Sequence, residues 1–80
     1  MQTTIYSRDI MTIFADRLEE LRISCGETQE NMARVLTCTE AHYQRLEDGK
    51  VIPNAIVINK VADHFGVSAD YLLGRKDERN

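Results

Sequence analysis

The sequence has no tryptophan, a single proline and only two cysteines among its 80 residues. No apolar run approaches the roughly 18 residues that a membrane-spanning helix needs. The N-terminus, MQTTIYSRDI, lacks the charged-then-apolar layout of a secretory signal. We therefore expect a cytoplasmic protein without a membrane partner. Because cytosolic thiols are kept reduced, we expect no disulfide between Cys25 and Cys38, which are small hydrophobes on this interpretation.

Side chains that carry catalytic or metal-binding chemistry are also scarce. The two histidines, His42 and His64, do not combine with the cysteines in a compact zinc-binding spacing. We find no Ser/His/Asp set, no paired carboxylates of catalytic type and no glycine-rich phosphate loop. A chain this short leaves little room for a substrate pocket of about 300 Å³. The sequence thus predicts no enzyme, no metal site, no cofactor and no small-molecule ligand.

Positive charge is in short supply for a chain that would bind nucleic acid. Ten Lys and Arg residues face 13 Asp and Glu residues, which gives a net charge of −3 at pH 7. Between residues 28 and 50 the acidic side chains outnumber the basic ones: Glu30, Glu40, Glu47 and Asp48 against Arg34, Arg45 and Lys50. Non-specific DNA binding depends on the neutralisation of phosphates. This charge balance therefore argues against a generic phosphate-binding surface.

What the sequence does contain is a pair of short helical patterns between residues 28 and 49, separated by Thr37-Cys38-Thr39. Thr28 and Thr39 are suitable N-caps, and Gly49 is a suitable stop. In the second helix Tyr43 and Leu46 are expected to face inward. The remaining side chains of that helix are left outside: Glu40, Ala41, His42, Gln44 and Arg45. Two helices joined by a tight turn, the second with an outward polar face, are typical of a DNA-binding helix-turn-helix.

Helical patterns also flank this stretch. We expect one helix from about residues 7–9 to 24, ended by Gly26, one from the cap Asn54 to about residue 64, and a last one over residues 69–73 after the cap Ser68. The apolar positions predicted to form the core are Ile10, Ile13, Phe14, Leu18, Leu21, Met32, Ala33, Val35, Leu36, Tyr43, Leu46, Val57, Ile58, Val61, Ala62, Phe65, Tyr71 and Leu72. The prediction is all-α: a compact five-helix bundle over residues 8–74, with an N-terminal arm (1–7) and a flexible tail (75–80).

Several short motifs together carry a family resemblance. They are LEELR (18–22), Gly26, Thr28-Gln29-Glu30, Ala33, Leu36, Glu47, Gly49-Lys50, Pro53 and VADHFGVSADYLLG (61–74). In this order, over residues 14 to 74, they resemble the Cro/phage-lambda-repressor-type helix-turn-helix family, also called the xenobiotic-response-element family. The resemblance implies a lambda-repressor-like five-helix bundle. It also implies a two-fold dimer that binds double-stranded operator DNA, with the third helix, residues 40–48, in the major groove.

The resemblance also implies roles for individual residues. Gln29 matches a position beside the DNA backbone, and Lys50 matches a phosphate-contacting position. Thr39, Glu40 and Ala41 match the first residues of the recognition helix, which reach base edges. His42, Gln44 and Arg45 match the outward positions that follow. Arg22 and Glu47 match a structural pair that ties the first helix to the third.

The sequence departs from the family pattern in ways that leave a second function open. Glu40 stands where a neutral hydrogen-bonding residue is usual, and Thr37 stands where glycine is common in the turn. Thr37 therefore implies either strain or a different course of the preceding helix. Val51, Ile52 and Ile56 form an apolar cluster around the loop that follows. We predict a sequence-specific DNA-binding transcriptional regulator. The alternative is a protein-interaction module on the same fold, of antirepressor or antitoxin type.

Overall fold

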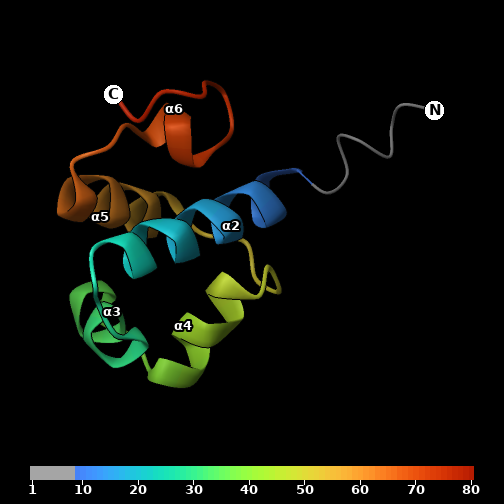
Figure 1. The fold of residues 1–80 in the computed structure, drawn as a ribbon. Coiled ribbons are helices and arrows are strands. Elements are labelled where there is room, and N and C mark those ends of the chain that lie inside the picture. The colour runs from blue at the N-terminus through green and yellow to red at the C-terminus, as the bar shows by residue number, and fades with distance from the viewer. Residues whose placement is uncertain (1–8) are drawn as a thin grey trace.

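The computed structural model describes residues 9–80, which form five helices (Figure 1). They are α2 (Asp9–Ser24), α3 (Gln29–Leu36), α4 (Glu40–Glu47), α5 (Ala55–Phe65) and α6 (Ala69–Leu72). These residues contain no strand, so the all-α prediction is confirmed for the described part of the chain. The predicted N-terminal arm, residues 1–7, lies outside it.

Four of these helices begin directly after the residues that the sequence predicts as their N-caps. Thr28, Thr39, Asn54 and Ser68 each accept a hydrogen bond from the backbone N–H three residues later, at N···O distances of 2.9–3.1 Å. All four cap residues have extended backbone geometry, which is the usual geometry of a capping residue. The four helix starts are therefore confirmed and have a local cause.

α2 ends at Ser24 as predicted, whereas the ends of α4, α5 and α6 differ from the predicted ends by one residue. α4 ends at Glu47 rather than at residue 48, because Asp48 is its C-cap and Gly49 follows with φ 73°. α6 ends at Leu72 rather than at residue 73, and α5 continues through Phe65 to its C-cap Gly66. Glycine takes the left-handed conformation without a steric penalty, which suits it to these ends.

α2 lies at the centre of the arrangement. It contacts α4 on one side and α6 on the other, while α3 contacts α4 and α5. In Figure 1, α3 and α4 lie below α2 and α6 lies above it. The helix-turn-helix pair, α3 and α4, is therefore supported by α2 and α5. The last helix, α6, packs against α2 and α5 on the side away from that pair.

The core consists of the apolar sides of all five helices. Its buried members are Phe14, Ala15, Leu18, Leu21, Met32, Ala33, Leu36, Tyr43, Leu46, Val61, Ala62, Val67, Tyr71 and Leu72. Most of these are predicted from helical spacing, whereas Ala15 and Val67 are additions. Val35, Val57, Ile58 and Phe65 are predicted as core but are only partly buried against it. Ile13, also predicted as core, is likewise only partly buried. The side chain of Ile10 lies outside the described residues.

The segment after α6 returns to the body of the domain. Arg17 Nη1 donates a hydrogen bond to the Lys76 carbonyl (2.8 Å), and its Nη2 lies 3.5 Å from an Asp77 carboxylate oxygen. The backbone N–H of Ser68 donates to the Arg79 carbonyl (2.6 Å). The flexibility of residues 75–80 stays a prediction, but their contacts with α2 and with the start of α6 were not anticipated.

Candidate nucleic-acid interface

The turn between α3 and α4 is built around an unusual threonine. Thr37 has φ 59° and ψ 50°, and among residues 9–80 it is the non-glycine residue with positive φ. This left-handed conformation is unfavourable for a β-branched side chain. Of the two alternatives that the sequence left open, the structure therefore has the strained one. Lys60 Nζ on α5 donates to Thr37 Oγ1 at 3.2 Å, which links the turn to α5.

α4 has a buried face and an exposed face, as its sequence pattern predicts. Tyr43 and Leu46 are buried in the core, and Glu47 is only 7% exposed. The side chains predicted to face outward are all exposed: Glu40, Ala41, His42, Gln44 and Arg45. Residues four apart lie on one side of a helix. The exposed face thus carries two adjacent stripes, one of Glu40 and Gln44 and the other of Ala41 and Arg45.

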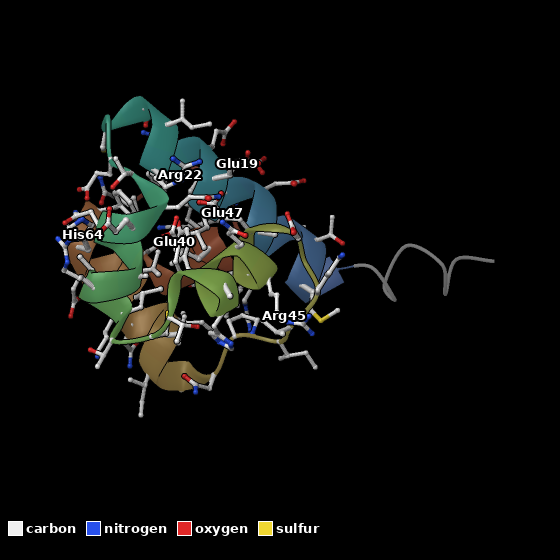
Figure 2. All side chains as sticks on the ribbon, turned by 90° about the horizontal axis from the view of Figure 1, so that it is seen from below. Glu19, Arg22, Glu40, Arg45, Glu47 and His64 are labelled. Atoms are coloured by element: carbon white, nitrogen blue, oxygen red, sulfur yellow. The ribbon has the colours of Figure 1, made fainter. Side chains whose placement is uncertain are left out.

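The buried end of α4 is held by a carboxylate with three side-chain donors. Arg22 Nε donates to Glu47 Oε2 at 2.6 Å and Arg22 Nη2 donates to Oε1 at 3.3 Å. The hydroxyl of Tyr43 donates to Oε2 at 2.6 Å. The amide of Gln29 donates to Oε1 at 3.0 Å. Figure 2 shows Arg22 and Glu47 side by side where α2 passes α4. One carboxylate therefore joins α2, α3 and α4.

These contacts shift the pKa values of the groups involved. Burial by itself raises the pKa of Glu47, but the hydrogen bonds from Arg22, Tyr43 and Gln29 outweigh it and leave the pKa below its ordinary value. The hydrogen bond with Glu47 raises the pKa of Arg22. Burial, followed by the bond to Glu47, raises the pKa of Tyr43. Glu47 is therefore an ionised acceptor that receives hydrogen bonds from a cation and two neutral donors.

Gln29 lies in a different environment from the one that the family pattern suggests. It is the first residue of α3, as expected, but its side-chain amide is directed to Glu47. At the start of α3, Asn31 N–H donates to the Thr28 hydroxyl and Met32 N–H to the Thr28 carbonyl, so the N–H groups of Gln29 and Glu30 are left without a partner among the described residues. Sequence reasoning missed this contact. The presence of a glutamine at the start of the helix was the only available sign that a donor could reach the carboxylate of the Arg22–Glu47 pair.

A second polar cluster lies at the start of α3 and was not predicted. His64 Nε2 lies 2.7 Å from Glu27 Oε2, and Asn31 Nδ2 donates to Glu27 Oε1 at 2.5 Å. Arg22 Nη1 donates to the Glu27 carbonyl at 3.0 Å. The hydrogen bond with His64 is the main cause that lowers the pKa of Glu27. No contact was predicted from the sequence for His64, whose partner Glu27 is 37 positions away.

The exposed charges near α4 are not neutralised by their neighbours. Among the side chains of residues 11–80, those of Glu40, Arg45 and Lys50 take part in no ion pair and in no hydrogen bond. In Figure 2, Arg45 lies well away from the Arg22–Glu47 contact. The Thr39 hydroxyl accepts from the His42 N–H at 3.1 Å, so its own hydrogen remains available to donate. This surface offers hydrogen-bonding groups of both kinds with few cations.

The three residues of the predicted apolar cluster, Val51, Ile52 and Ile56, differ in their exposure to solvent. Ile52 and Ile56 are 76% and 65% exposed, whereas Val51 packs partly against the core. Cys38 is half-buried, as expected of both cysteines, and burial raises its pKa. Cys25 is exposed, contrary to that expectation. Among the described residues both thiols are free, no cluster of three metal-ligating side chains occurs, and no helix has the length and apolar character to cross a bilayer.

Comparisons with known proteins agree with this architecture. Residues 13–72 match the family described as "Helix-turn-helix domain". The chain is also 38% identical over 61 residues to the SPbeta prophage-derived uncharacterized HTH-type transcriptional regulator YonR of Bacillus subtilis (strain 168). The matched stretch covers 76% of this chain and 56% of that protein, so the chain spans little more than half of its relative's length. On the matched residues and on the α3–turn–α4 geometry, the chain belongs to the helix-turn-helix domain family.

Proposed function

We propose that this chain is a sequence-specific DNA-binding transcriptional regulator of the Cro/lambda-repressor type, with α4 in the major groove. The observation that carries the proposal is the division of α4. Its inner face is fixed to α2 and α3 through Glu47, and its outer face presents polar and small side chains without partners among the described residues. A rigidly held helix with an outward polar face is what base recognition requires.

The exposed side chains have the chemistry for base and phosphate contacts. Arg45 can donate two hydrogen bonds to guanine, and the Ala41 methyl can contact thymine. Gln44 is suited to adenine, and Lys50 can contact a phosphate. The ring nitrogens of His42 can donate or accept a hydrogen bond at a base edge or a phosphate. Backbone N–H groups at the start of α3 would face phosphate without a cation.

We also infer that the chain acts as a homodimer on DNA. A single module of this size buries only about 600–1,000 Å² of protein surface on DNA, which limits its affinity. Two copies related by a two-fold axis would bind two half-sites about one helical turn apart. The naming of the Bacillus subtilis relative as a transcriptional regulator supports the regulatory role. Sedimentation of the protein with and without a selected duplex tests the stoichiometry.

A selection from random duplex DNA tests the proposal. We expect the chain to retain a defined sequence, with affinity that falls as salt rises. Arg45→Ala should relax the preference at one base pair, whereas Lys50→Ala should weaken all sequences alike and flatten the salt dependence. Arg75→Ala is the matched control, because Arg75 is an exposed arginine that follows α6 in the sequence, and α6 lies on the opposite side of α2 from α4 (Figure 1). Absence of any retained sequence at low salt would overturn the proposal.

The exposed pair Ile52 and Ile56 favours the second candidate, a protein-interaction module on the same fold. Two large apolar side chains in open solvent near one helix start are typical of a contact surface. If DNA is not retained, replacement of both by serine should abolish binding of the partner and leave the unfolding midpoint nearly unchanged. The same pair could also serve the proposed homodimer.

A further inference from the structure

The residue at the start of α4 points to a specific feature of the DNA that this chain would bind. We infer that Glu40 selects cytosine at one position of the operator, by accepting a hydrogen bond from the cytosine N4 amino group. The inference depends on the proposed function and adds the identity of one base. It also assigns the acidic side chain a role in discrimination between sequences rather than in affinity.

The surroundings of Glu40 leave its carboxylate without a partner. Glu40 is the first residue of α4 and is exposed, and its carboxylate makes no hydrogen bond or ion pair with the side chains of residues 11–80. Along the helix, its neighbours one turn later are the buried, neutral Tyr43 and the neutral Gln44. The nearest exposed cation on α4, Arg45, belongs to the adjacent stripe. No basic side chain of its own helix therefore neutralises the carboxylate.

The chemistry of the major groove restricts what such a group can contact. N-terminal residues of a recognition helix are the ones that reach base edges. An ionised carboxylate only accepts hydrogen bonds, and only the amino groups of cytosine and adenine donate in this groove. Adenine carries the acceptor N7 beside its amino group, and guanine and thymine present only acceptors. Each of these acceptor atoms repels a carboxylate. The N4 amino group of cytosine is therefore the one major-groove donor that has no hydrogen-bond acceptor beside it on its own base.

A contrast with glutamine sharpens the inference. A glutamine amide both donates and accepts, so it pairs with the N6 and N7 atoms of adenine. Exchange of Glu40 for glutamine keeps the size and shape of the side chain and changes only its charge and its donors. The expected result is therefore a change of preferred base from cytosine to adenine, and not merely weaker binding.

A purely structural role of Glu40 makes a different prediction. A negative side chain in the first turn interacts favourably with the positive end of the helix dipole. If that were its whole role, Glu40→Gln would lower the unfolding midpoint slightly and would leave the base preferences of the protein unchanged. Base preference is thus the measurement that separates the two roles.

The experiment is a selection from random duplex DNA with the full chain, sequenced position by position, for the wild type and for Glu40→Gln, Glu40→Asp and the control Glu20→Gln. Glu20 is an exposed glutamate on α2, so its replacement changes the net charge equally. We expect cytosine at one position to be preferred roughly tenfold by the wild type. We expect Glu40→Gln to prefer adenine there, and Glu40→Asp, with its shorter side chain, to retain cytosine less strongly.

Each outcome decides the matter. Retained DNA with the same base at every position in the wild type and in Glu40→Gln overturns the assignment of Glu40 but leaves the proposed function standing. A shift in Glu20→Gln equal to that in Glu40→Gln also overturns it, because charge alone would then be the cause. Failure of the wild type to retain any sequence overturns the proposed function together with this inference. Circular dichroism of each variant establishes that α4 is folded, and Glu40→Asp carries the test if Glu40→Gln is unfolded.

Discussion

Glu40 and Glu47 are the first and last residues of α4, and the structure gives these two carboxylates opposite surroundings. Glu47 is 7% exposed and accepts hydrogen bonds from Arg22, Tyr43 and Gln29. Glu40 is exposed, and its carboxylate has no partner among the side chains of residues 11–80. Glutamate thus serves two purposes in one helix. Glu47 holds the C-terminal end of α4 in place, and Glu40 leaves its carboxylate available for a ligand at the N-terminal end. The difference arises from the neighbours, since seven positions along a helix bring Glu47 against α2 and α3.

Removal of Glu47 should have the largest effect. Glu47→Ala leaves the Arg22 guanidinium and the Tyr43 hydroxyl without their acceptor in a largely buried site, so we expect a loss of about 3 kcal/mol in the free energy of unfolding. Glu40→Ala is the matched control and should cost only about 0.5 kcal/mol, from the helix dipole. Urea unfolding of both variants measures this. Equal losses would show that the contrast between the two glutamates has no energetic basis.

The tyrosine contact should come next. Tyr43→Phe removes the hydroxyl that donates to Glu47 Oε2 and should lower the free energy of unfolding by about 1.5 kcal/mol, the usual range for a bond to a charged group. Tyr71→Phe is the control: Tyr71 is also buried, but its hydroxyl makes no hydrogen bond with the described residues. A loss in Tyr71→Phe as large as that in Tyr43→Phe would contradict the role assigned to the network.

Protonation of Glu47 should have a smaller effect, because the protonated carboxyl keeps its volume and some of its hydrogen bonds. Its pKa in the folded protein is lowered, so the folded state favours the ionised form. The resulting stability is present above the ordinary glutamate pKa of about 4.3 and is lost as the pH falls through the lower folded pKa. Urea midpoints measured below about pH 5 should fall less steeply in Glu47→Gln than in the wild type. Parallel curves would be inconsistent with an ionised Glu47.

The smallest effect is expected at the exposed ion pair of α3. Arg34 Nη2 lies 3.3 Å from Glu30 Oε2, and both side chains are about 70% exposed. Pairs of this kind contribute about 0.3–0.5 kcal/mol, because solvent screens them and the long side chains lose freedom. Arg34→Ala should therefore lower the midpoint of urea unfolding by little more than the error of that measurement. A loss comparable with that of Glu47→Ala would mean that exposure does not decide the strength of ion pairs in this domain.

Much of the fold could be predicted from the sequence because its causes are local. Thr28, Thr39, Asn54 and Ser68 each accept from an N–H three residues away, so the cap lies within the same short segment as the helix start. Helical spacing likewise predicts that Tyr43 and Leu46 are buried. The exposed side of α4 follows from the same periodicity, whereas the DNA-contacting roles of its side chains are implied by the family resemblance.

The polar contacts of the candidate site were less predictable. Family resemblance suggested the Arg22–Glu47 pair, but neither the Tyr43 hydroxyl nor the Gln29 amide was expected to complete it. The contact between Glu27 and His64 was missed altogether. Each of these side chains has another plausible environment in solvent, and a pattern within one helix does not distinguish between the two.

The sequence alone therefore determined the helices, their caps, the turn between α3 and α4 and the outward face of α4. The tertiary structure decided which side chains meet Glu47, that Thr37 adopts the left-handed conformation, and that α2 and α5 support the turn. The physical reason is distance along the chain. Caps and periodicity act over three or four residues, whereas the Arg22–Glu47 and Lys60–Thr37 contacts join residues 25 and 23 positions apart. Such contacts exist only after the helices have packed.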